Sequence, residues 1–186
     1  MRWTALLALT LAAVACDDAG EPPLVAEDIM LIHEMSDQIV IGLEHYVSSQ
    51  GIRRAHVLAD TAFFLEGQSG VELRVLTVSF FDNTGALTSI LTSRTGTYDW
   101  DTGDMTATDS VVVVNPAEGR RIETSVMHYD SLKGRIWSDQ PTTMVEADGT
   151  VVKGTAFDSD AGITEVNMTS ATVQKPDAEQ PSLREP

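Results

Sequence analysis

The sequence predicts an all-β fold, and three observations lead to that prediction. Val, Thr, Ile, Ser, Gly and Asp recur in short bursts, and long stretches rich in Leu, Glu and Lys are missing. Apolar and polar residues alternate with period two from Ile39 onward. An aromatic residue followed by Asp and then Gly recurs along the chain, which is typical of strand ends that lead into turns. The 186 residues suffice for one ordinary domain.

The first segment, residues 1–15, is predicted to be a lipoprotein signal peptide. It has one Arg near the start, an apolar run from Ala5 to Val14, and small residues before Cys16. The run is too short for a permanent transmembrane helix, which needs about 20 apolar residues. An ordinary signal peptide with an incidental Cys is the alternative. Because Cys16 is the only cysteine, no intramolecular disulfide can form.

The next segment, residues 16–38, is predicted to hold a tether and possibly a short helix. The stretch "DDAGEPPLV" has two prolines and no periodicity, whereas "AEDIMLIHEM", residues 26–35, could form a short helix. The β-domain is predicted over 39–174. The tail, 175–186, has three prolines and no apolar run, so we expect it to be disordered.

The first strands are predicted as a series of hairpins. Ile39, Ile41 and Leu43 alternate with Val40, Gly42 and Glu44, and "SSQG" turns the chain into a return strand over 52–60. The stretches "ADTAFFLEG" and "VELRVLTVSFF" are predicted as further strands, separated by a turn at 66–70.

The element of aromatic residue, Asp and Gly is predicted to form a hairpin corner at each of its four copies. The aromatic ring would face the core, the Asp side chain would accept a backbone hydrogen bond, and the Gly would supply a positive φ. In "HYDSLKGRIWSDQP", Pro141 should limit the return strand to an edge or a strand end. The four copies are Phe81, Asp82 and Gly85; Tyr98, Asp99 and Gly103; Tyr129, Asp130 and Gly134; and Phe157, Asp158 and Gly162.

Composition and motifs argue against several classes of function. A formal charge of −16 repels the phosphate backbone of nucleic acids. The four histidines lie on separate segments without metal-site spacing, so no metal or other cofactor is expected. Asp99, Asp101 and Asp104 surround a Gly but lack the ligand spacing of a calcium loop. No nucleophile elbow or phosphate loop is present, and we expect no enzyme activity.

Binding therefore remains as the expected class of function. Alternation counted outward from the turns predicts which residues face inward, and these would either fill a closed core or line an apolar trough that suits acyl chains. Trp137 lies in the middle of a predicted strand, either as an aromatic of the core or of a sheet face, or as a lipid contact. The predicted inward residues are Leu91, Tyr98, Met105, Val111, Val113, Ile122, Met127, Tyr129, Ile136 and Phe157.

The order of motifs over about 39–173 resembles the LptC family of lipopolysaccharide export, itself similar to the LptA/OstA periplasmic domains. An aromatic-Asp turn followed by Gly, a hydrophobic-Thr strand, Tyr-Asp, Ile-x-Ser-Asp-x-Pro and Gly-x-x-Phe-x-x-Asp follow one another as in that family. The residues at these positions are Phe81, Asp82 and Gly85; Ile122 and Thr124; Tyr129 and Asp130; Ile136, Ser138, Asp139 and Pro141; and Gly154, Phe157 and Asp160.

This resemblance implies an open, V-shaped antiparallel β-jellyroll whose interior carries lipid A chains. It also implies a location in the periplasm, with lipopolysaccharide received from an inner-membrane ABC transporter and passed to an LptA-like protein through edge-strand pairing. "AVAC" resembles a lipobox, so lipidation of Cys16 would anchor the protein. Asp17 and Asp18 favour the inner over the outer membrane. A β-sandwich lipoprotein that acts as an interaction or calcium-binding module is the alternative.

Overall fold

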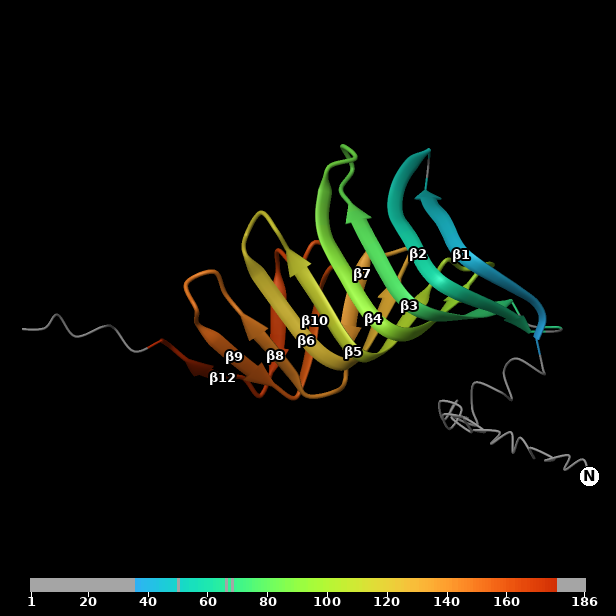
Figure 1. Ribbon diagram of the computed structural model, residues 1–186. Coiled ribbons are helices and arrows are strands. Elements are labelled where there is room, and N and C mark those ends of the chain that lie inside the picture. The colour runs from blue at the N-terminus through green and yellow to red at the C-terminus, as the bar shows by residue number, and fades with distance from the viewer. Residues whose placement is uncertain (1–35, 50, 66, 68, 177–186) are drawn as a thin grey trace, which may run out of the picture.

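Antiparallel pairing joins twelve strands into one sheet in the computed structural model (Figure 1). The structure describes residues 36–49, 51–65, 67 and 69–176, and these include no helix. Cys16, the predicted helix over 26–35 and the tail from 177 onward lie outside the described residues. The strands are β1 (Ser36–Ser49), β2 (Ile52–Leu65), β3 (Gly70–Phe81), β4 (Leu87–Asp99), β5 (Met105–Asn115), β6 (Arg120–Asp130), β7 (Arg135–Ser138), β8 (Thr142–Val145), β9 (Val151–Gly154), β10 (Ala156–Asp160), β11 (Val166–Thr169) and β12 (Thr172–Gln174).

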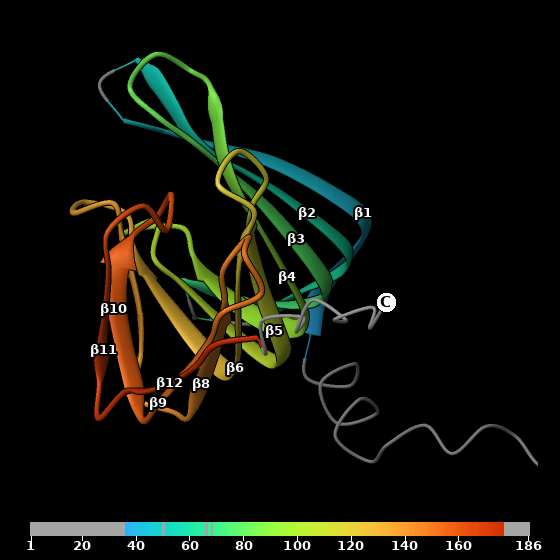
Figure 2. The same cartoon turned by 90° about the vertical axis from the view of Figure 1, so that its left-hand side faces the viewer.

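The sheet is open, because its two end strands do not pair with each other. Strands β1 to β7 follow in chain order, and β10 and β11 continue from β7. A second branch leaves the other half of β6 and runs through β8 and β9 to β12. Figure 2 shows the result as a V, with β1 to β4 in one arm and β10 and β11 in the other. The all-β, open antiparallel fold expected from the family resemblance is confirmed.

A row of backbone irregularities crosses the sheet and bends its strands. Val75 in β3 has a φ of 52°, and Asp109 and Ser110 in β5 have φ values of 63° and 55°. The register shifts between Thr108 and Val111 where β5 pairs with β6. At Val75 the buried residues of β3 change from odd to even positions, whereas in β5 the extra residue of the bulge keeps the buried residues at odd positions on both sides. The bend lets both halves of each long strand present apolar residues to the interior.

The first hairpin forms as predicted, but its alternation is interrupted. Gly42 has a φ of 69°, and Ile41 beside it is 74% exposed. Val40, Leu43 and Val47 pack against the core instead of the predicted series Ile39, Ile41, Leu43. Residues 59–65 were expected in a separate strand but continue β2 without a break.

Three of the predicted hairpin corners form around their Asp. The carboxylate of Asp82 accepts the Thr84 amide at 2.7 Å, that of Asp99 accepts the Asp101 amide at 2.8 Å, and that of Asp130 accepts the Lys133 amide at 2.9 Å. Hydrogen bonds from the backbone, led by that from Thr102, hold the pKa of Asp99 below its usual value. The glycines at 85, 103 and 134 have positive φ, as predicted.

The fourth copy was assigned to the wrong Asp. Asp158 lies within β10, opposite Trp137 of β7, and its carboxylate pairs with Arg135. Asp160 forms the turn, since its carboxylate accepts the amides of Gly162, Thr164 and Glu165 at 2.8–3.0 Å. The error arose because Phe157 faces the core but does not end its strand. The strand continues with period two to Asp160, so the turn begins two residues after Asp158.

Phe81 also differs from the prediction, which placed its ring against the core. Phe81 is only half-buried, whereas its neighbour Phe80 is buried in the core. Trp137 lies on the outer face, where its ring stacks on His128 at 5.2 Å and remains 38% exposed.

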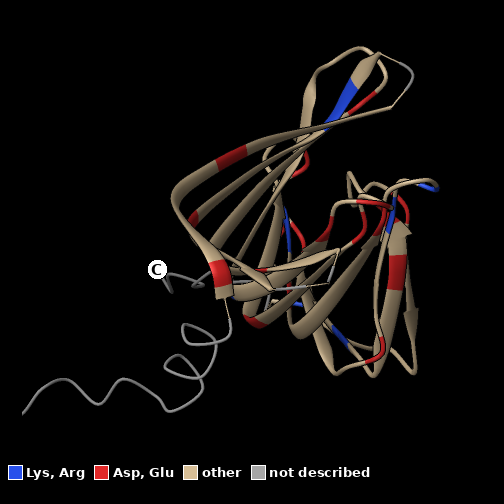
Figure 3. Ribbon diagram, turned by 90° about the vertical axis from the view of Figure 1, so that its right-hand side faces the viewer, with Lys and Arg blue, Asp and Glu red and all other residues tan. Residues whose placement is uncertain are grey.

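Acidic positions are spread over both arms of the V (red in Figure 3). No helix within the described part of the chain has the length and hydropathy to cross a membrane.

Candidate functional site

The inner face of the V carries the buried hydrophobic core of the fold. All ten residues that were predicted to face inward are buried there, on β4, β5, β6, β7 and β10. Sequence reasoning missed the contribution of β2 and β3, and in β3 the positive φ at Val75 interrupts the alternation. The missed inward residues are Ala55, Val57, Ala59, Val71, Leu73, Leu76, Val78 and Phe80, with Ile163 from the turn after β10.

Side chains from both arms fill this interior. The cavity between Leu76, Met105, Met127 and Tyr129 measures only about 10 Å³, which is about the space of one water molecule. A ligand can therefore enter only if the arms move or the side chains repack. Met105 and Met127 suit such repacking, since the unbranched thioether side chain adapts readily to irregular surroundings.

The residues that carry the family resemblance hold the interior in shape. The hydroxyls of Thr124 and Ser138 are buried and lie 3.1 Å apart, so they satisfy each other between β6 and β7. Pro141 lies in the break between β7 and β8, where a missing N–H is tolerated. A Cβ on Gly154 would lie 2.9 Å from the Thr169 carbonyl oxygen, so only glycine permits this close approach.

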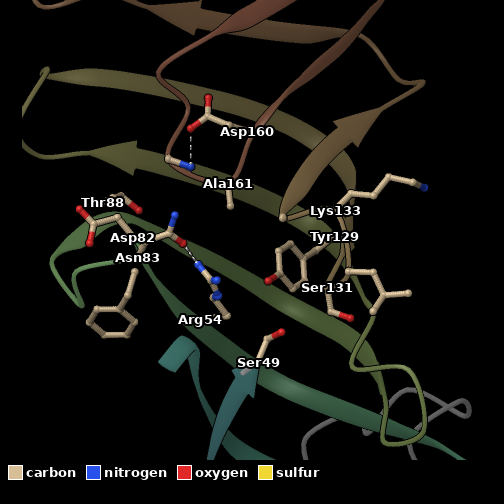
Figure 4. Close-up of a pocket in the computed structure, with 14 residues that line it drawn as sticks. Ser49, Arg54, Asp82, Asn83, Thr88, Tyr129, Ser131, Lys133, Asp160 and Ala161 are labelled. Carbon is tan, nitrogen blue, oxygen red and sulfur yellow. Dashed lines mark hydrogen bonds between the residues drawn. The ribbon is translucent and has the colours of Figure 1, made fainter. Parts of the chain in front are cut away.

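A polar cavity of about 440 Å³ lies at the mouth of the V, and Figure 4 shows its lining. Arg54 of β2 and Asn83 of the β3–β4 turn come from one arm, and Lys133 and Ala161 come from turns on the other. The Arg54 guanidinium donates to the Asn83 side-chain oxygen. Tyr129 lines both this mouth and the apolar interior.

A second cavity of about 310 Å³ extends the mouth along β1. It shares Ser49, Arg54, Ser131 and Leu132 with the first, so the two form one groove. An aromatic cluster lines its far end. His45 Nε2 and the Tyr98 hydroxyl are hydrogen-bonded at 3.0 Å, and the His45 ring meets the Trp100 ring at 4.4 Å.

Burial governs the ionisation of this cluster. It lowers the pKa of His45 and, together with the negative charge of Asp99, raises the pKa of Tyr98. Both rings are therefore neutral near pH 7, and the groove end is a neutral aromatic surface.

The carboxylates of the acidic loop after β4 accept hydrogen bonds from backbone amides of nearby turns. Asp99 accepts the amides of Asp101 and Thr102, and Asp104 accepts the amide of Ser131 at 2.9 Å. Over the described residues 36–176, no group of three or more His, Cys, Asp or Glu side chains could hold a metal ion. The loop acts as a structural link between the β4–β5 and β6–β7 turns.

Both ends of the sheet offer unpaired strand edges. Among the strands that the structure describes, β1 pairs only with β2 along its fourteen residues, and on the other side β11 pairs only with β10 and β12 only with β9. An unpaired edge presents a row of N–H and C=O groups that can bond to another strand. The chain can thus add a strand at either end of its sheet.

Comparison with known proteins agrees with this geometry. The crystal structure of LptH, the LptA homologous periplasmic component of the conserved lipopolysaccharide transport device from Pseudomonas aeruginosa, is similar with a TM-score of 0.52 and 15% sequence identity. The similarity covers 66% of this chain and 94% of that one, and at this identity it establishes a shared fold. No curated protein sequence matches the chain. A family model described as "Lipopolysaccharide-assembly, LptC-related" matches residues 6–171, so the chain belongs to the LptC family.

Proposed function

We propose that the protein is a periplasmic lipid-binding component of lipopolysaccharide export. It receives lipopolysaccharide from an inner-membrane ABC transporter and passes it to a periplasmic bridge of β-jellyrolls, without catalysing a reaction. The observation that carries this proposal is the continuous apolar inner face of an open sheet in an LptC-family chain. Acyl chains match such a surface because they require apolar area and few polar contacts.

Lipid entrance requires the arms of the V to separate or the side chains between them to repack. Apolar side chains from the two arms contact each other in the interior. Bound acyl chains would replace these contacts with other apolar contacts. Little apolar area would be exposed to water in this exchange, so its free-energy cost would be small. The open topology permits the movement, since no hydrogen bond joins β1 to β11.

Photo-crosslinking tests lipid binding on the inner face. A photoreactive phenylalanine analogue at Tyr129 or Ile136 should form adducts with lipopolysaccharide, because both side chains are buried inside the V. The same analogue at Trp137, on the outer face of β7, is the matched control and should form none. Folded protein that yields no lipid adduct at either inner position would be incompatible with the proposal.

The free edges are proposed to dock the neighbouring jellyrolls through strand addition, which supplies main-chain hydrogen bonds along the whole edge. Ile41 on the edge strand β1 is 74% exposed, whereas Leu58 is 40% exposed on the internal strand β2. The photoreactive analogue at Ile41 should therefore capture a protein partner, and at Leu58 it should not. Equal capture at both positions would argue against docking at this edge.

Anchoring through Cys16 is also proposed, on the strength of the lipobox resemblance alone. Acyl groups on Cys16 would hold the protein at the inner membrane, at about 0.8 kcal/mol per buried CH₂. The Cys16→Ser variant should then move from the membrane fraction to the soluble periplasmic fraction. An unchanged distribution after fractionation would mean that another segment provides the anchor.

A further inference from the structure

Tyr129 separates the polar mouth from the apolar interior. Its ring is 4% exposed and lies 4.9 Å from the ring of Phe80, inside the core. Figure 4 shows its hydroxyl directed into the mouth, toward the side of the cavity where Arg54 lies. The residue thus has an apolar body in the interior and a polar end in the mouth.

Arg54 is unusual among the arginines of the described residues. It donates to the neutral side chain of Asn83 and forms no ion pair with a carboxylate. Its neighbour Arg53 lies over the Tyr46 ring at 4.3 Å. The other described arginines all pair with Asp or Glu: Arg74, Arg94, Arg120, Arg121 and Arg135. In a chain of net charge −16, a cation that faces a polar cavity without a carboxylate partner is a prepared site for an anion.

The carboxylates around the mouth bind groups other than Arg54. Asp82 accepts the amides of Thr84 and Ala86 at 2.7 and 3.0 Å, and Asp160 accepts three amides of its own turn. Asp130 pairs with Lys133 at 2.6 Å. These contacts fix the carboxylates against their own turns, and none of them forms an ion pair with Arg54.

The ionisation of Tyr129 agrees with this arrangement. Burial raises the pKa of its hydroxyl to about 12, and the charge of Arg54 acts in the opposite direction. The guanidinium is therefore close enough to influence the hydroxyl. Tyr129 is neutral near pH 7 and can donate a hydrogen bond to an oxygen atom in the mouth.

We propose that the mouth is the headgroup subsite of the lipid and that Arg54 binds a phosphate on that headgroup. This inference rests on the function proposed above and deepens it. The guanidinium offers a planar fork of donors that matches a phosphate, with Tyr129 and Asn83 beside it as further polar partners. The acyl chains extend past Tyr129 into the interior. At about 440 Å³, the cavity lies within the usual range of about 300–1,000 Å³ for small-molecule sites.

Binding of two lipids to matched variants tests this subsite. The probes are bisphosphorylated lipid A and the same lipid after enzymatic removal of its phosphates. Arg54→Gln should weaken binding of the phosphorylated lipid about tenfold, the usual effect of losing a charge-assisted hydrogen bond. It should leave binding of the dephosphorylated lipid unchanged. Arg53→Gln removes the same charge from the adjacent, exposed position and should change neither.

A second variant and a folding control distinguish loss of the phosphate contact from loss of the fold. Arg54→Lys keeps the charge but lacks the fork, so it should bind the phosphorylated lipid with an affinity between those of the wild type and Arg54→Gln. Circular dichroism melts establish that each variant is folded. Inorganic phosphate, titrated alone, should not bind measurably.

The possible outcomes separate this inference from the function on which it rests. If the wild-type protein binds both lipids equally, the phosphate subsite is wrong and the lipid-binding function stands. If it binds neither lipid, both are wrong. Equal losses in Arg54→Gln and Arg53→Gln would indicate a general effect of charge and overturn the subsite. Binding of inorganic phosphate through Arg54, without an effect on lipid, would mean that the mouth serves a free anion.

Discussion

Met127→Asp should lower the free energy of unfolding by about 3–5 kcal/mol, the usual consequence of an uncompensated charge in a protein interior. Met127 is 1% exposed, and the cavity beside it measures about 10 Å³. This cavity has space for about one water molecule, and neither Lys nor Arg lines it. Because whole domains are stable by only about 5–15 kcal/mol, much of the protein should be unfolded or readily unfolded. Urea denaturation followed by circular dichroism measures the change.

Two controls define what this result means. Ser125→Asp places the same charge on the same strand at an exposed position and should change the unfolding free energy by less than about 0.5 kcal/mol. Met127→Leu conserves volume and should cost less than about 1.5 kcal/mol. A Met127→Asp protein that unfolds at the same urea concentration as Ser125→Asp would indicate a wet, already open interior.

The consequence concerns how lipid binding can be tested. In a trough that stands open, a charge at Met127 would reduce lipid binding and leave the fold intact. In the packed interior, the same substitution removes the fold and the lipid site together. Loss of lipid capture in Met127→Asp therefore cannot identify a lipid contact, and crosslinking at Tyr129 or Ile136 is the more direct probe.

Alternation predicted the inner face wherever the strands are regular. From Leu91 to Phe157, every residue predicted to face inward is buried, because the side-chain period of a strand is two on both sides of each turn. The family resemblance supplied the open, V-shaped antiparallel arrangement. Composition alone supplied only the all-β class.

The errors arose where the backbone departs from regular geometry. Gly42 and Val75 have positive φ and shift the alternation of β1 and β3, and a β-branched residue such as Val75 gives no local sign of this. The corner at Asn115 was also missed. It has the same spacing to Gly119 as Asp99 has to Gly103, and its side chain accepts the amides of Ala117 and Glu118 at 3.0 Å. A search for Asn as well as Asp would have found it.

No sequence pattern predicted the mouth, because it is assembled from four separate turns and strand ends. Arg54 and Tyr129 are 75 positions apart in the chain and meet only when the arms of the V face each other. The turn that follows Asp160 closes one side of this cavity. That turn also contains Ile163, a fully buried β-branched residue whose φ of 49° is unfavourable for its type.

The contacts of Arg120 explain how this turn is held. Its side chain, 17% exposed, pairs with Glu118 and Glu146 at 3.0 Å and donates to the carbonyl oxygens of Ile163 and Thr164. The neighbouring Asn115 amide donates to the Gly162 carbonyl oxygen at 2.9 Å. Together these bonds attach the turn after β10 to the β5–β6 corner and offset the backbone strain at Ile163.

Arg120→Ala should therefore lower the free energy of unfolding by about 3 kcal/mol, since it leaves the partly buried Glu146 carboxylate and two carbonyl oxygens without their cation. Arg121→Ala is the matched control. Its partner Glu123 and its own side chain are 49% and 46% exposed, and such surface pairs contribute about 0–1 kcal/mol. Hydrogen exchange should also show faster exchange of the amides from Ala161 to Glu165 in Arg120→Ala alone. Equal destabilisation by the two substitutions, with unchanged exchange in the turn, would mean that the strained turn is stable without Arg120 and that its closure of the mouth has another cause.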